Sequence, residues 1–184
     1  MVDLTISEDM IEIMASMKGK TLKSIEGNYW FKCKDFLQIV RINLGQFAVE
    51  IYADYVAIKW FWGAGHLIDA EENCFIVKKT DLSGHNYPEG WKVVQFLKDE
   101  KISEVIVVRD NIKTNKGDEI ISDAGFVIKT TEQVYSFSRG GLDIYLNESN
   151  KIDMPLSEKD VKEQYTDEYN SVEVVEFKRD FIFL

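Results

Sequence analysis

The chain has 184 residues, a length that fits one domain spanning 1–184, and its 45% hydrophobic and 12% aromatic content is that of a folded globular protein. Its formal net charge of −10 argues against nucleic-acid binding, which draws its affinity from Lys and Arg, and against docking on an anionic membrane surface. A surplus of acid favours a soluble protein or a strongly basic protein partner.

The first predicted element is a helix that begins after Ser7. Ser7 is a good N-cap residue, and the two acids that follow it favour the positive end of the helix dipole. Gly19 stands where a helix commonly ends, and Ile6 and Ile11 have the spacing of a hydrophobic staple. Apolar residues recur at helical spacing in between, so we expect this helix to pack on a sheet.

From Thr21 onward the apolar period changes to two, which is typical of strands. Three alternating segments predict an antiparallel meander with short turns at 43–45 and 53–54. The predicted strands are 37–42, 47–52 and 55–62. After Trp62 the alternation breaks, and it resumes at 74–79.

The second half of the chain continues the strand pattern. Residues 91–97 fit either a strand or a short helix, whereas 105–108 are apolar on both faces and predict an interior strand covered on each side. A turn at 115–118 follows. Another meander is predicted, with Gly140-Gly141 as a hairpin loop. Its strands are 126–129, 134–137 and 142–146.

A short second helix is expected after Ser157. Leu156, Ser157, Asp160 and Val161 reproduce a capping arrangement with its staple. Alternation returns at 172–177. The chain then ends on four apolar residues, 181–184, which must dock or pair because they would otherwise form an exposed adhesive edge.

These elements predict an α+β fold, a mostly antiparallel sheet arranged in meanders with an N-terminal helix and a short helix near the C-terminus. Cys33 and Cys74 each lie in a strand pattern, and no signal peptide is recognisable before them. We therefore expect a cytoplasmic protein with two reduced, buried thiols.

No motif points to a cofactor or a metal ion. Gly19-Lys20-Thr21 follows a helix instead of a strand and lacks the glycine spacing of a phosphate loop. The acids Asp69, Glu71 and Glu72 are not spaced like a calcium loop. We therefore expect a protein without cofactor or metal, and a non-enzymatic one.

The most unusual segment runs from Trp60 to His66. Trp60 and Trp62 should share one strand face, with two glycines and His66 following them. One interpretation is a Trp pair that fills the core; the other is an aromatic binding patch, since Trp is enriched at interface hot spots.

The second candidate region is the acidic stretch that begins at the second helix. Glu163, Asp167 and Glu168 are the candidate contacts, because carboxylates on a helix and loop can steer and select a basic partner. The alternative is an ordinary solvated helix face.

Three functional hypotheses follow. The leading one is a non-enzymatic protein-binding module, in one version a toxin-neutralising, immunity-type protein that occludes a basic partner. The second is a small-molecule-binding or hydrolytic domain with its pocket near Trp60, Trp62, His66 and His85. The third is a homo-oligomer formed through an edge strand or the apolar C-terminus.

Overall fold

The computed structural model describes residues 1–29, 36–62, 66–82, 92–140, 143–166 and 171–184. At 29, 36, 56–62, 66–73 and 92–94 it describes the backbone alone.

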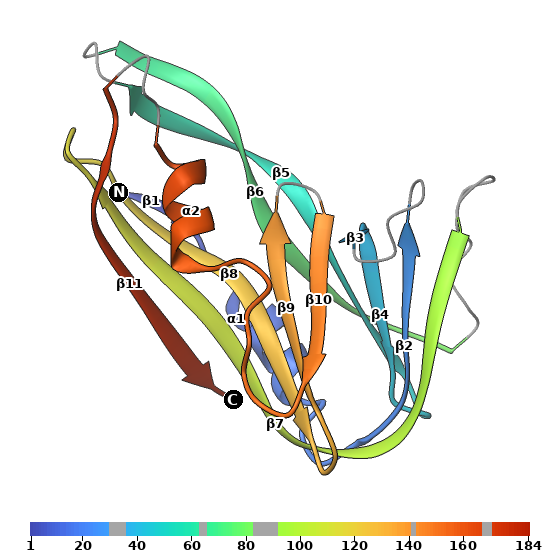
Figure 1. The fold of residues 1–184 in the computed structure, drawn as a ribbon. Helices are drawn as coiled ribbons and strands as arrows, with labels where there is room; N and C mark the ends of the chain where they lie inside the picture. Colours follow the sequence, from blue (N-terminus) through green and yellow to red (C-terminus); the bar gives the residue numbers. More distant parts are fainter. Residues whose placement is uncertain (30–35, 63–65, 83–91, 141–142, 167–170) are drawn as a thin grey trace.

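Eleven strands and two helices are formed by these residues (Figure 1). In chain order they are β1 (Val2–Leu4), α1 (Glu8–Ala15), β2 (Thr21–Tyr29), β3 (Phe36–Leu37), β4 (Ile39–Asn43), β5 (Ala48–Trp62), β6 (His66–Thr80), β7 (Lys92–Thr114), β8 (Glu119–Thr130), β9 (Val134–Gly140), β10 (Asp143–Ser149), α2 (Glu158–Gln164) and β11 (Val174–Phe183).

The long strand β7 joins two sheets. Its first part, to Lys101, pairs with β2 in sheet B, which continues through β4 and β5 to β6. From Ile102 it pairs with β8 in sheet A, which continues through β9 and β10 to β3, with β11 on the other side of β7 and β1 parallel to β8. Near this change the strand register shifts in both pairings. The β2–β7 register shifts between Leu22 and Ser24, and the β7–β8 register shifts between Ile102 and Glu104. Such bulges bend a strand, so β7 can pass from one sheet into the other.

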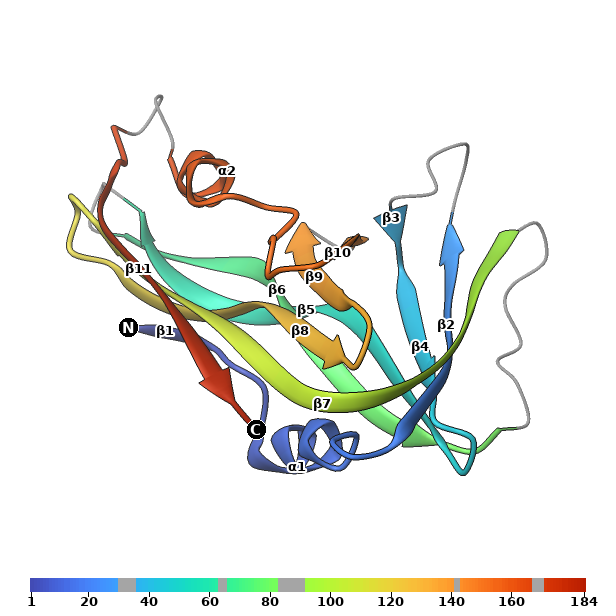
Figure 2. The same cartoon turned by 60° about the horizontal axis from the view of Figure 1, so that its bottom comes forward.

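Both faces of sheet A are covered. Figure 2 shows α1 on one side of β7 and α2 on the other. The alternation within β7 explains why two cores exist: Val105 and Val107 face the main core with α1, whereas Ile106 and Val108 belong to a smaller cluster on the opposite face. The prediction that 105–108 form an interior strand covered on each side is confirmed, since all four residues are at most 2% exposed.

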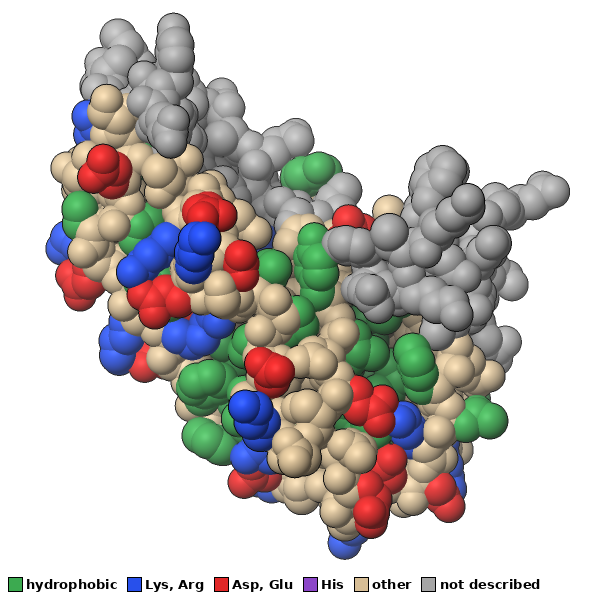
Figure 3. Space-filling model, in the orientation of Figure 1, with side chains coloured by type: hydrophobic (Ala, Val, Ile, Leu, Met, Phe, Trp, Pro, Cys, Tyr) green, Lys and Arg blue, Asp and Glu red, His purple; other side chains and the backbone are tan. Residues whose placement is uncertain are grey.

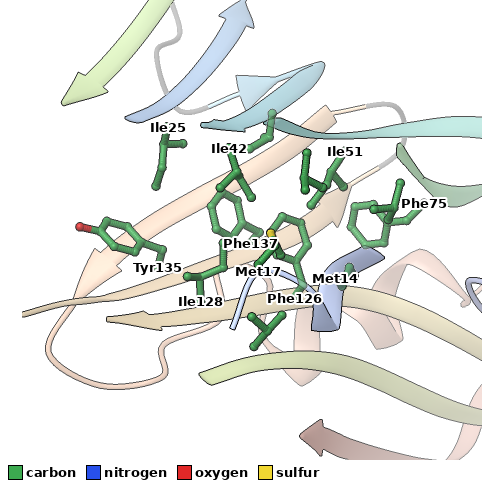
Figure 4. Close-up of a cluster of buried hydrophobic side chains, with 14 of the residues drawn as sticks. Met14, Met17, Ile25, Ile42, Ile51, Phe75, Phe126, Ile128, Tyr135 and Phe137 are labelled. Carbon is green, nitrogen blue, oxygen red and sulfur yellow. The ribbon is translucent and has the colours of Figure 1, made fainter. Parts of the chain in front are cut away.

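The main core lies between the two sheets and α1 (Figure 4). The rings of Phe126 and Phe137 stack with centroids 4.2 Å apart, and the ring of Phe75 meets Phe126 edge-on at 5.8 Å. Met14 and Met17 bring α1 into the same cluster. The core is therefore built from residues that are far apart in the sequence.

The predicted fold class is confirmed, and so are its best-marked local features. Ser7 caps α1 and Ser157 caps α2. Gly45 and Gly117 adopt φ values of +79° and +87° in the turns after β4 and β7, a conformation that glycine tolerates best. The β9–β10 hairpin is present, but Gly140, predicted to lie in its loop, belongs to β9 and pairs with Asp143.

Several boundaries predicted from the sequence are wrong. The strand expected at 37–42 is divided, because β3 ends at Leu37 and pairs in sheet A, whereas β4 begins at Ile39 and pairs in sheet B. The turn expected at 53–54 does not exist, because β5 runs without interruption from Ala48 to Trp62. The break expected between Trp62 and Cys74 is also too long, since β6 already begins at His66. Ala53 and Asp54 are poor strand formers, but β6 pairs with β5 along its whole length, and that ladder overrides local propensity. Residues 92–97, left open between strand and helix, belong to β7.

We expect the substitution Phe126→Ala to lower the free energy of unfolding by about 3–5 kcal/mol, because it removes a buried ring and leaves a cavity. Urea denaturation followed by circular dichroism measures the loss. Leu97→Ala is the control, because Leu97 is a large apolar residue on β7 that is 78% exposed; it should change the free energy by less than about 0.5 kcal/mol. Equal losses in the two variants would contradict this placement of the core.

Candidate functional site

Strands β5 and β6 form a long hairpin whose closed end carries the aromatic segment. The ladder places Trp62 opposite His66 and Trp60 opposite Ile68. Directly opposite residues of an antiparallel pair share one face, so Trp60, Trp62 and His66 occupy positions on the same face of the hairpin. Their side chains lie outside the described part of the structure, as does His85, so the choice between core and binding patch stays a prediction.

Helix α2 is fixed by a capping box in its first turn and by apolar contacts with sheet A, to which Leu156 and Tyr165 at its two ends also contribute. The Ser157 hydroxyl accepts the Asp160 N–H at 3.3 Å, and the Asp160 carboxylate accepts the Ser157 N–H at 2.8 Å, which closes a capping box. Val161 is buried against Ile112 and Ile120 of sheet A. With only this stripe buried, the other faces of the helix are left to solvent.

A wide-open, shallow groove of about 840 Å³ lies along the exposed face of α2, and its described wall comes from this helical segment alone. Its described lining is Glu158, Lys159, Lys162, Glu163 and Thr166. Lys162 pairs with Glu158 at 2.6 Å and Lys159 with Glu163 at 3.5 Å, and the Glu163 side chain is 65% exposed. Exposed pairs of this kind contribute little free energy because water screens them, so a partner's charges can replace them easily. Of the predicted contacts, Glu163 lies in this groove, whereas Asp167 and Glu168 fall outside the described residues.

The hairpin end and α2 belong to the same end of the molecule. Figures 1 and 2 both place the closed end of β5 and β6 near α2 and the start of β11. Acidic and basic side chains are interleaved over the region of α2 in Figure 3. The fold therefore brings the strand positions of Trp60 and Trp62 to the end that carries Glu163, although about a hundred residues separate them in the chain.

A buried charge pair anchors the segment that leads into α2. Asp110 on β7 is fully buried and accepts two hydrogen bonds of 2.7 Å from the Arg179 guanidinium on β11. Arg179 also donates to the Leu156 carbonyl at 3.0 Å, and Leu156 N–H donates to the Ser138 hydroxyl at 3.2 Å. A cavity beside this pair measures about 10 Å³, room for roughly one water. Because this cavity is too small for any ligand larger than a water molecule, we assign these groups the structural role of holding α2 in place.

The sequence pattern alone did not predict the Asp110–Arg179 pair, although the position of Asp110 in the alternation of β7 indicates that this carboxylate is buried. Asp110 continues the alternation of Ile106 and Val108, so it occupies a position on the covered outer face of β7. A buried carboxylate requires a cationic partner, which the sequence could not identify because Arg179 is 69 residues away.

Cys74 is a free, buried thiol, as its strand pattern predicts. Burial raises its pKa above the ordinary value, and the nearby Arg139 charge offsets this in part. A thiol with a raised pKa is a poor nucleophile near neutral pH, which favours a structural role for Cys74. Cys33 lies outside the described residues.

Comparison with protein-family models, curated proteins and solved structures found no match to this chain. Neither α1 nor α2, the helices of the described part, has the length and apolar content that crossing a membrane requires. Within the described ranges, no group of three or more His, Cys, Asp or Glu side chains is placed to hold a metal ion. The side chains of Asp69, Glu71 and Glu72 are not among those described.

Tyr135 on β9 forms a second polar cluster, partly buried, with Lys98 and Glu100 of β7. Its hydroxyl lies 3.1 Å from the Glu100 carboxylate, and the Lys98 ammonium lies 5.0 Å from its ring centroid. Burial raises the pKa of Tyr135 to about 12, against the lowering effect of Lys98 and with a smaller contribution from Glu100 in the same direction as burial.

This pKa predicts a specific loss of stability in alkali. Because the folded-state pKa lies above the ordinary value of 10.0, the contribution of Tyr135 to stability is complete below pH 10 and is lost as the pH rises toward 12. Urea denaturation at a series of alkaline pH values should show a steeper decline for the wild type than for Tyr135→Phe. Tyr55→Phe, at a residue 52% exposed, should keep the wild-type slope. Parallel curves for wild type and Tyr135→Phe would show that Tyr135 ionises normally.

Proposed function

We propose that this protein is a non-enzymatic protein-binding module that takes a basic partner against its α2 end. The observation that carries the proposal is the groove beside α2, in which carboxylates are held by exposed and easily replaced ion pairs. A Lys or Arg of the partner can displace Lys159 from Glu163 at little cost in free energy. In this groove, therefore, a Lys or Arg of the partner can take the place of the protein's own Lys in an ion pair.

The charge distribution supports a basic partner. Among the described residues, ten different Lys and Arg side chains are engaged in ion pairs with the protein's own carboxylates. Some of these cations are largely buried, as Arg41 and Arg179 are. With a net charge of −10, such pairing leaves an excess of carboxylates to meet a partner. That excess speeds association with a basic protein and disfavours acidic ones.

Binding would act by occlusion. Carboxylates at the α2 end steer the partner and pair with its Lys or Arg, and the aromatic residues Trp60 and Trp62 at the same end serve as anchors. In the most specific form of the proposal the partner is a nuclease or another basic toxin, and this protein neutralises it by filling its cationic groove.

A second candidate function is a small-molecule or hydrolytic site at the hairpin end. The register that sets His66 opposite Trp62 favours it, because it places an aromatic residue and a titratable residue at neighbouring positions on one strand face. A co-purifying metabolite, with no protein retained from a lysate of the native host, would favour this candidate over the first.

The triple substitution Glu163→Lys, Asp167→Lys and Glu168→Lys tests the first proposal. The wild type should retain a basic protein from host lysate in stoichiometric amount, to be identified by mass spectrometry and then purified. Charge reversal should weaken binding of that protein about tenfold or more, mainly by slowing association, and should reduce its dependence on salt. Surface plasmon resonance at low and high ionic strength measures both effects.

The matched control is Glu8→Lys, Glu12→Lys and Glu132→Lys, which changes the net charge equally on α1 and in the β8–β9 turn. Binding that falls equally in both variants would reflect overall charge alone. Unchanged binding in the α2 variant, with an unaltered circular-dichroism spectrum, would remove the α2 end as the contact surface.

A further inference from the structure

Strand β11 is an edge of sheet A. It pairs with β7 from Val174 to Phe183, and on its other side no strand of the described ranges is paired with it. In Figure 1 it lies along the left border of the molecule. Natural edge strands are usually blunted because their free backbone groups can pair with another chain.

This edge is also unusually apolar. Seven large hydrophobic residues of the described chain are exposed, and three of them lie on β11. They are Val175 at 60%, Phe181 at 39% and Phe183 at 62%. Phe181 and Phe183 stand opposite the buried residues Val108 and Ile106 of β7, so they extend the apolar outer face of sheet A to its border.

The hydrogen bonds to β7 determine which backbone groups of β11 are free. Leu184 N–H donates to the Val105 carbonyl, so Leu184 and the residues at every second position before it direct their backbone groups toward β7. In an antiparallel ladder the alternate residues direct theirs away. The outward residues are therefore Phe177, Arg179, Phe181 and Phe183, and they form a regular row of donors and acceptors.

The sequence of β11 is complementary to itself in the antiparallel register centred on Arg179. A register centred on Phe177 would also set Glu176 opposite the partner's Lys178, but it would include the irregular segment between Val174 and Glu176 in the pairing. In a symmetric pair of strands one residue must stand opposite its own copy, since opposite residues share a face. With Arg179 at that position, Lys178 faces the partner's Asp180 and Phe177 faces the partner's Phe181, each of these contacts occurring twice. With Lys178 there, Glu176 would face the partner's Asp180, and with Asp180 there, two carboxylates would meet.

The contact of Arg179 with its own copy is tolerable in this register. Its guanidinium is already neutralised by the buried Asp110, with two hydrogen bonds of 2.7 Å. Lys178 and Asp180, by contrast, are 69% and 38% exposed, and their ion pair along the strand is weak. Asp180 also accepts a hydrogen bond of 3.1 Å from the Asn111 amide, but a carboxylate has further lone pairs. Both are available to a strand placed beside them.

We propose that β11 is a self-association edge, through which two copies of this protein pair antiparallel about Arg179 and join their A sheets into one. About six backbone hydrogen bonds form, two at each of three residue pairs: Arg179 with its copy, and Phe177 with Phe181 in both directions. The contact is small compared with a standard interface, so dissociation falls in the micromolar range. This inference does not depend on the α2 site, and a dimer leaves open whether α2 binds a partner.

Charge exchange across the edge is the decisive test. Sedimentation velocity over concentrations from submicromolar to submillimolar should show the full-length protein passing from monomer to dimer. Lys178→Asp should weaken the dimer roughly tenfold, because two attractive pairs become repulsive. Asp180→Lys should do the same. The double variant with both substitutions should restore the dimer, because the charges are again complementary.

A backbone variant tests the hydrogen bonds separately. Phe181→Pro removes an N–H that points away from β7, a position at which an edge strand tolerates proline, and should abolish the dimer while the circular-dichroism spectrum is retained. Phe181→Ala should weaken the dimer less, because it keeps the N–H. A protein that stays monomeric at all concentrations, or a dimer indifferent to Lys178→Asp and to Phe181→Pro, would overturn the proposal.

Discussion

The backbone ladder along β7 is the interaction on which the rest of the structure depends. Its first half bonds to β2 and its second half to β8 and β11, so one strand supplies hydrogen bonds to both sheets. The bulges near Ile102 let it turn between them, and the turn brings Phe75 of sheet B against Phe126 of sheet A. Without that bend the two apolar faces could not enclose one core.

Polar groups on the outer face of sheet A decide where α2 can lie. A bare apolar face would accept a helix at many positions, but the Asp110–Arg179 pair must stay satisfied, and Arg179 also holds the Leu156 carbonyl. Val161 adds an apolar contact, but apolar packing is not directional and does not fix the position of the helix. The position of α2, and with it the groove that carries Glu163, therefore follows from a buried ion pair between β7 and β11.

The two surfaces of interest differ in kind. The α2 end offers side chains: charges in weak pairs that a basic partner can replace, next to the hairpin end with Trp60 and Trp62. The β11 border offers backbone groups, with Phe181 beside them. Side-chain charge provides speed and selectivity in association, whereas a strand edge provides directional bonds whose register depends on few side chains. One protein can use both, because they do not share residues.

The sequence by itself determined the fold class, the two capped helices and the glycine turns, because these depend on residues close together in the chain. Ser7, Ser157 and Gly117 act within a few positions of themselves. Only the tertiary structure decided that β5 runs through Ala53-Asp54, and that Asp110 finds Arg179. It also decided that α2 and the closed end of the β5–β6 hairpin lie at the same end of the molecule. Strand pairing and buried charge pairing join residues far apart, and neither leaves a period that a local window can detect.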